Sequence, residues 1–126
     1  MMPFDAAFDP VFEAVKQAGQ DMGLQVSRAD QVWKNSEVIQ DIFSLIFRSR
    51  FVICDFSDKN PNVFYEAGIA HTLGRPVIPV AQNKDDIPFD IGHHRYVIYD
   101  NTEQGRDGLI RNIRSRMKDL AQNNAV

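Results

Sequence analysis

The sequence predicts a single α/β domain, with helices packed on both faces of a parallel sheet, from three observations. Its 126 residues make one ordinary domain, and a content of 44% apolar and 25% charged residues is typical of a globular chain. Apolar runs beginning at Phe51, Pro76 and Tyr96 are continuous rather than alternating, which is typical of strands buried on both faces. Segments with helical spacing separate these runs, so right-handed crossovers and a doubly wound sheet are expected.

The amino-terminal half is expected to contain two helices. Asp9 as N-cap and Pro10 as the first helical residue open the first helix, and Gly23 ends it. Residues 24–29 are short and compatible with a strand. A second helix is expected over residues 36–48, because its apolar residues recur on one face.

Two further helices are expected in the carboxyl-terminal half. The third follows Asn60-Pro61-Asn62, a motif that supplies both an N-cap and a proline for the first turn. Ala67, Ala70 and Gly74 leave room for that helix to approach the sheet closely. The last helix is expected to begin near Arg106.

Composition limits the classes of partner. The formal charge of -3 argues against a general nucleic-acid binder, which needs clustered basic residues. One basic cluster lies near the carboxyl terminus, and we interpret it as the solvated face of the last helix. Its members are Arg106, Arg111, Arg114, Arg116 and Lys118.

The single cysteine and the short apolar stretches indicate the cellular compartment in which the protein is expected. Cys54 lies within an apolar run, so we expect a buried, inert thiol and no disulfide. The apolar stretches are too short to span a bilayer, and the amino terminus has no signal-peptide pattern. We therefore expect a cytoplasmic protein with no membrane partner.

Ligands of such sheets bind at the carboxyl ends of the strands, so the loops there are the candidate binding loops. These loops lack a Walker A pattern and a GxGxxG pattern, and no cofactor is predicted. His93 and His94 are adjacent, and neighbouring side chains diverge, so no metal site is predicted.

Glu66 is the most informative candidate. It lies near the start of the third helix, among apolar and small residues, and shares part of its face with Ala70. We expect the helix dipole to favour its ionised form. A carboxylate beside a sugar C1 can stabilise or trap an oxocarbenium-like centre, which is what cleavage of an N-glycosidic bond needs. The structural alternative is an exposed glutamate paired with Lys59 or Arg75.

The stretch from Phe51 to Val80 resembles the nucleoside 2-deoxyribosyltransferase-like superfamily, in its nucleotide-binding, TIR-like branch. The motif Asn60-Pro61-Asn62-Val63-Phe64-Tyr65-Glu66 carries the resemblance, together with Pro3-Phe4 and residues 86–90. It implies a three-layer, flavodoxin-like fold with a parallel sheet of about five strands. Family members have apolar residues ahead of Met-Pro-Phe, whereas this chain starts at Met1, so we expect a truncated first strand.

The resemblance also implies a set of site residues. Glu66 would be the nucleophile of a deoxyribosyltransferase, or the glutamate that supports NAD cleavage in TIR-type enzymes. Asp41 and Asp5 would complete the catalytic set, Asp41 by helping to place the nucleoside and Asp5 by lying near the same pocket, although the transferases carry an acid near the position of Asn60. The remaining substrate-binding positions are Phe4, Asp55, Asn60, Asn62, Phe89 and His93.

The sequence leaves three functions open. The first is an enzyme that acts on a nucleoside, a nucleotide or an NAD-like substrate at its N-glycosidic bond. The second is a non-catalytic nucleotide-binding or signalling module of the same fold. The third, weakest, is a phosphoacceptor receiver domain with Asp55 as acceptor, because only Asp5 supplies an acid after the first strand. Self-association is also expected, since a truncated central strand leaves unusual exposed surface.

Overall fold

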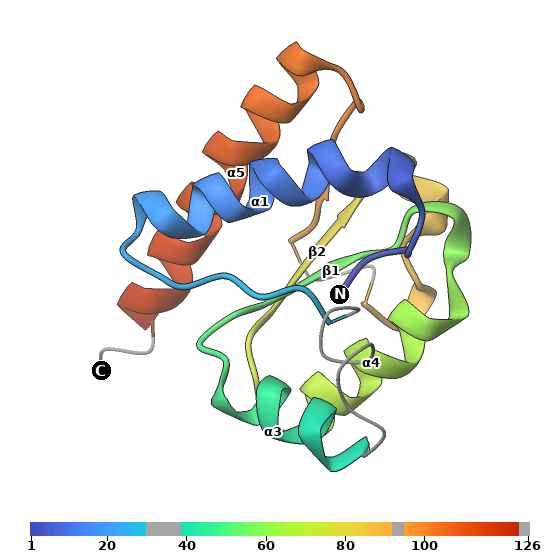
Figure 1. Cartoon of the computed structure of the whole chain (residues 1–126), viewed down its shortest axis with the longest axis vertical. Coiled ribbons are helices and arrows are strands. Elements are labelled where there is room, and N and C mark those ends of the chain that lie inside the picture. Colours follow the sequence, from blue (N-terminus) through green and yellow to red (C-terminus); the bar gives the residue numbers. More distant parts are fainter. Residues whose placement is uncertain (30–38, 92–94, 124–126) are drawn as a thin grey trace.

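The sheet lies at the centre of the molecule, with helices on both faces (Figure 1). The computed structural model describes residues 1–29, 39–91 and 95–123. In these residues three parallel strands pair in the order β1-β2-β3. The strands are β1 (Val52–Asp55), β2 (Val77–Ala81) and β3 (Val97–Ile98). The predicted α/β class with a parallel sheet is therefore confirmed.

Four α-helices and four short 3-10 helices complete the described chain. The α-helices are α1 (Asp9–Asp21), α3 (Ile39–Arg48), α4 (Pro61–Thr72) and α5 (Glu103–Asn123). The 3-10 helices are η1 (Ala6–Phe8), η2 (Ser57–Lys59), η3 (Lys84–Asp86) and η4 (Phe89–Ile91). None of the described helices is long and apolar enough to cross a membrane.

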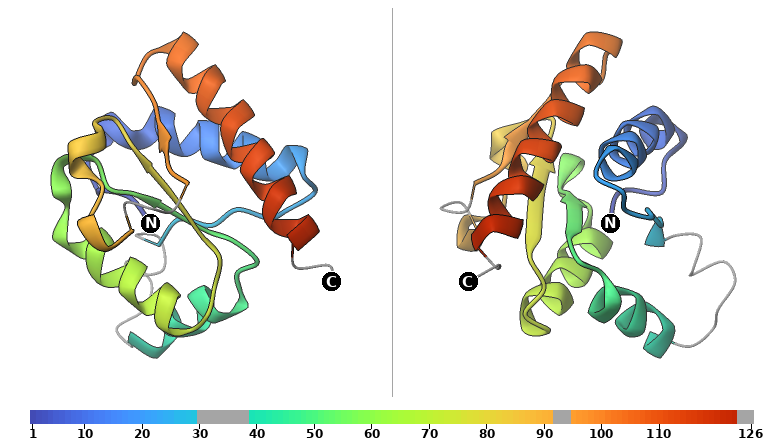
Figure 2. Two further views of the ribbon diagram at one scale, coloured as in Figure 1. Left: turned by 180° about the vertical axis from the view of Figure 1, so that it is seen from behind. Right: turned by 90° about the vertical axis from the view of Figure 1, so that its left-hand side faces the viewer.

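Each face of the sheet has its own apolar core. Val52 and Cys54 of β1 face α3 and α4, whereas Ile78 and Val80 of β2 face α1 and α5. Figure 2 shows the two helix layers on opposite sides of the strands. Burial on both faces explains why the strand sequences are continuous apolar runs.

The amino terminus extends the sheet beyond β1. The Met1 amino group donates to the Ile53 carbonyl, and the Asp55 amide donates to the Met1 carbonyl, both at 2.8 Å. In a parallel ladder, a residue of one strand forms hydrogen bonds with the residues on either side of its partner in the neighbouring strand. Met1 therefore occupies a strand position on the outer edge of β1.

Local signals explain where the helices begin and end. The Asn60 side chain accepts from the Asn62 amide at 3.0 Å and caps α4, and Pro61 is its first residue, as predicted. Gly23 has φ +74° just after α1, in the left-handed region where glycine is favoured. Asp9 is the first residue of α1 and Phe8 is the N-cap, so the prediction of Asp9 as N-cap was one residue late.

Three other boundaries differ from the predictions. Residues 24–28 form no strand, and β3 has two residues where the apolar run suggested four. The last helix begins at Glu103, three residues before Arg106, because Thr102 already accepts from the Gly105 amide. The second helix is described from Ile39 to Arg48, and its predicted start at residue 36 lies outside the described residues.

Candidate functional site

A hollow of about 210 Å³ lies beside the first two turns of α4. The described residues that line it are Phe4, Asn62, Tyr65 and Glu66. We call it the Glu66 hollow. Phe4 and Tyr65 are about half exposed, so aromatic surface is available to a ligand at its rim. The structure thus brings together three of the predicted site residues, Phe4, Asn62 and Glu66.

Glu66 is a buried carboxylate in this otherwise exposed setting. Its side chain is 2% exposed, and both carboxylate oxygens are buried. It is the sixth residue of α4 and lies on the face that also buries Val63, Ala67 and Ala70. The expected help from the helix dipole is small at this position, because that effect is confined to the first turn.

The surroundings of Glu66 include two other ionisable groups of β1. The pKa of the Cys54 thiol is raised to about 12, chiefly by burial; the Met1 ammonium lowers it in part, and the charges of Glu66 and Asp55 add to the rise. The carboxylates of Glu66 and Asp55 and the Met1 ammonium therefore all lie close enough to Cys54 to change its pKa. The prediction of an inert Cys54 agrees with this, because a thiol is reactive only as thiolate.

Asp55 belongs to a buried polar network at the carboxyl end of β1. The Tyr99 hydroxyl donates to Asp55 at 2.5 Å, and the Ser57 amide donates to the other carboxylate oxygen at 2.9 Å. Gln82 donates to the Tyr99 hydroxyl at 3.3 Å. Burial raises the pKa of Asp55, while the bonds from Ser57 and Tyr99 lower it in part. Burial and the Asp55 charge raise the pKa of Tyr99.

This network fixes the loop that leads into α4. The Gln82 amide donates to the Ser57 hydroxyl at 3.0 Å, and the Asp58 amide donates to Asp86 at 3.0 Å. Asp58 and Lys59 have φ of 62° and 53°, a left-handed conformation that costs a non-glycine residue about 1–2 kcal/mol. Two strained residues in succession persist only where their surroundings hold them, and they cluster at functional sites.

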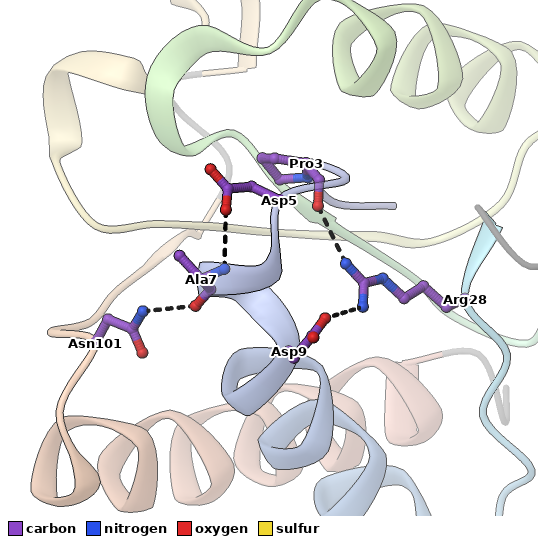
Figure 3. A network of polar contacts seen from close by, with 6 residues as sticks. All are labelled: Pro3, Asp5, Ala7, Asp9, Arg28 and Asn101. Atoms are coloured by element: carbon purple, nitrogen blue, oxygen red, sulfur yellow. Dashed lines mark hydrogen bonds and ion pairs between the residues drawn. The ribbon is translucent and has the colours of Figure 1, made fainter.

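Asp5 has a structural contact of its own. It is exposed, and its side chain accepts from the Ala7 amide at 2.9 Å, capping η1 (Figure 3). Asn101 donates to the Ala7 carbonyl at 3.0 Å, so this turn is tied to the segment after β3. Asp5 is not one of the described residues that line the Glu66 hollow.

The other predicted site residues have different positions. Asp41 is exposed in the first turn of α3, and Asn60 is half-buried as the cap of α4. Phe89, in η4, is 89% exposed. None of these three is among the described residues lining the hollow. His93 lies outside the described residues.

Two features of the site went unnoticed in the sequence. Tyr65 lines the hollow, and its place next to Glu66 in the motif was a signal that could have identified it. The Met1 ammonium acts on Cys54 and Asp55, and no sequence signal reveals this because it depends on the ladder with β1. Within residues 1–29, 39–91 and 95–123, no three His, Cys, Asp or Glu side chains gather as metal ligands would.

Comparison of this chain with protein-family models, with characterised proteins and with solved structures finds no match.

Proposed function

We propose that this chain handles a nucleoside, nucleotide or NAD-like ligand at the Glu66 hollow and cleaves or transfers at its N-glycosidic bond. The observation that carries the proposal is a buried carboxylate beside a hollow with two half-exposed aromatic rings, near the carboxyl ends of parallel strands. Ligands bind at that edge of open α/β sheets. Aromatic faces suit a planar base, and a carboxylate suits a sugar C1 that becomes positively charged.

Each residue of the hollow would have its own role in the reaction. Phe4 and Tyr65 would hold the base, and the Asn62 amide group would bond to it or to a sugar hydroxyl. The Glu66 carboxylate would attack C1, or stabilise the oxocarbenium centre, as the bond to the base breaks and the base leaves with the electron pair. Water or a second base then attacks C1, which gives hydrolysis or transfer.

The resemblance to the deoxyribosyltransferase-like superfamily remains part of this proposal. It rests on the motif Asn60-Pro61-Asn62-Val63-Phe64-Tyr65-Glu66, three of whose side chains line the hollow. We also propose that the fold is flavodoxin-like, with Met1 in the position of a first, central strand. The two backbone hydrogen bonds between Met1 and β1 support that position.

The direct test is incubation of the protein with NAD and, separately, with each deoxynucleoside. Free base or nicotinamide is then measured by chromatography. Release that depends on protein concentration supports the enzyme, and transfer is distinguished from hydrolysis by adding a second base. If no base is released from any of these substrates, the catalytic proposal fails.

A non-catalytic nucleotide-binding module is the second candidate, and one observation favours it. Both Glu66 oxygens are buried, and neither Asp5 nor Asp41 is among the described residues lining the hollow. Neither of these two acids would then serve as the general acid or base for a ligand in the hollow. Binding of a nucleotide without base release, measured by calorimetry on the same samples, would favour the module.

A further inference from the structure

The loops at the carboxyl ends of the strands carry more negative than positive charge. Met1 lies beside β1 and runs parallel to it, so residues 3–5 reach the same end of the sheet as the segments that follow β1, β2 and β3. The charged side chains of the described part of these segments are Asp5, Asp58, Asp85, Asp86, Asp90 and Asp100, with Lys59 and Lys84. A phosphate monoester carries a charge of about −1.5 to −2 near neutral pH, so this end of the sheet repels it.

Backbone amides at this end already donate to side-chain oxygens of the chain itself. Amides at the starts of helices are the groups that bind phosphate in many proteins. In this chain the Asn62 amide, in the first turn of α4, donates to the Asn60 side chain at 3.0 Å. The Asp58 amide, just before α4, donates to the Asp86 carboxylate at 3.0 Å. A ligand phosphate would have to displace these oxygens, so this end of the sheet suits a ligand without a phosphate.

The Glu66 hollow has surfaces that attract a cation. The rings of Phe4 and Tyr65 are both about half exposed at its rim, and the face of an aromatic ring attracts a ligand cation that lies over it. The Glu66 carboxylate lines the same hollow, and its side chain is only 2% exposed. Attraction between opposite charges is stronger where water is excluded. A positive charge in the hollow is therefore attracted both by the aromatic rim and by the buried carboxylate.

A positive charge on the base also assists the chemistry at C1. When the bond between C1 and the ring nitrogen breaks, its electron pair goes to that nitrogen. A neutral base then leaves as an anion unless it receives a proton, whereas a cationic base leaves as a neutral molecule and needs no proton. The Glu66 carboxylate forms the new bond to C1, and water hydrolyses this ester, which releases the sugar and gives one proton to the solvent.

We propose that the preferred ligand of the Glu66 hollow is a nucleoside with a permanently cationic base and no phosphate, such as a pyridinium riboside or an N7-alkylated purine nucleoside. The cationic ring packs against Phe4 and Tyr65, and its glycosidic bond lies toward Glu66. This inference rests on the proposed function and narrows its substrate class. Among the ligands considered there, an ordinary deoxynucleoside lacks the positive charge, and NAD adds two phosphates to it.

Binding of the base is tested by itself with 1-methylnicotinamide and nicotinamide, which differ by one methyl group and one positive charge. In a titration followed by NMR chemical shifts, we expect 1-methylnicotinamide to bind at least about tenfold more tightly. This measurement needs no catalysis, so it does not depend on the intrinsic reactivity of the cationic base. Equal binding of the two compounds, or no binding of 1-methylnicotinamide, would overturn the inference.

Substitutions of Tyr65 test the aromatic contact in the same titration. Tyr65→Leu should reduce the preference for the cation by about threefold or more, whereas Tyr65→Phe should keep it because the ring remains. Tyr96→Leu is the matched control, because Tyr96 is partly exposed and is not among the described residues that line the hollow. It should bind both compounds as the wild type does. An unchanged preference in Tyr65→Leu would overturn the assignment of the cation to this hollow.

The effect of phosphate is tested with nicotinamide riboside and its 5′-phosphate, which share one cationic base. We expect kcat/KM to be at least about tenfold higher for the riboside at low salt. Asp86→Asn keeps an oxygen for the Asp58 amide and removes one charge, so the ratio should narrow by about twofold or more. Glu13→Gln removes one charge at an exposed position of α1 and should leave the ratio unchanged. Equal kcat/KM for the two substrates would overturn the exclusion of phosphate.

Base release from N7-methylguanosine and from guanosine separates this inference from the proposed function. After subtraction of the release without protein, we expect kcat/KM to be at least about tenfold higher for the methylated nucleoside. Faster release from guanosine would overturn the inference and leave the proposed function standing. If no substrate releases its base, the proposed function fails, and the titration with 1-methylnicotinamide still decides whether the hollow prefers a cation.

Discussion

The Tyr99 hydroxyl donates to the buried Asp55 carboxylate at 2.5 Å and so joins the end of β1 to the segment after β3. The two residues are 44 positions apart in the sequence, and both are almost fully buried. Their bond also orders Ser57 and Gln82, which hold the loop leading into α4. The stability of the site and the position of Glu66 therefore depend on a network outside the hollow.

Removing the Tyr99 hydroxyl should destabilise the fold. Tyr99→Phe keeps the ring but leaves the buried Asp55 carboxylate without this donor, a loss of about 1.5–3 kcal/mol for a bond to a charged group. Urea unfolding followed by circular dichroism measures the difference. Tyr96→Phe is the control, because Tyr96 is 39% exposed and its substitution should change the free energy of unfolding little. Equal stability of Tyr99→Phe and wild type would contradict the role of the network.

Asp55 should give the stability a specific pH dependence. Burial raises its pKa in the folded state, so the folded protein holds this proton more tightly than the unfolded chain. Stability from this group is therefore greatest below its unfolded pKa of about 3.9, and it falls as pH rises toward the raised folded value. The wild-type curve minus the Asp55→Asn curve isolates this slope. A difference that rises with pH in that window would show that the sign is wrong.

Two glycines in helices should respond oppositely to alanine. A Cβ on Gly105 would lie 2.1 Å from the Asp100 carbonyl oxygen, so the backbone must shift, at a cost of about 1–3 kcal/mol. A Cβ on Gly68 of α4 meets nothing within 4 Å, so Gly68→Ala should add roughly 0.5–1 kcal/mol. Melting temperatures of the two variants measure this. A lowered melting temperature for Gly68→Ala would indicate that the surface of α4 is covered by something.

Cys54 should react with thiol reagents only after the protein opens. Its pKa of about 12 leaves almost no thiolate near neutral pH, and the side chain is fully buried. In a disulfide-exchange assay, we expect labelling of the native protein to follow the unfolding rate and to accelerate with urea. Complete labelling within seconds in buffer would show that Cys54 is accessible.

The apolar runs predicted the strands because burial on both faces needs continuous apolar residues, as at Val77 and Val80. The segment over residues 24–29 was not predictable in the same way. A β-compatible segment becomes a strand only beside a partner edge, and this one pairs with none of the described strands.

The candidate site shows the same division between local and long-range signals. Glu66 was identified as a candidate from the sequence because it shares a helix face with small, apolar residues such as Ala70. In the structure, Glu66 and Ala70 are both buried. The bond between Asp55 and Tyr99 depends on how three strands align, and no local pattern carries that information. The helix begins at Pro61, as the sequence predicted, so Glu66 lies beyond the first turn, where the effect of the dipole is small.

The central claim is that Glu66 supplies the charge for chemistry at a sugar C1. Glu66→Gln keeps the size of the side chain and removes that charge. Since a group used mainly in the transition state affects kcat and kcat/KM together, both should fall by roughly a hundredfold or more. Asn62→Ala, which changes an exposed wall of the same hollow, should mainly raise KM.

The most direct measurement is base release from NAD and from deoxynucleosides by wild-type and Glu66→Gln protein, with melting temperatures recorded on the same samples. The account predicts base release by the wild type, loss of at least about a hundredfold in Glu66→Gln, and an almost unchanged melting temperature. Full activity in Glu66→Gln would contradict the claim, and so would activity lost together with folding, which would make Glu66 a structural residue.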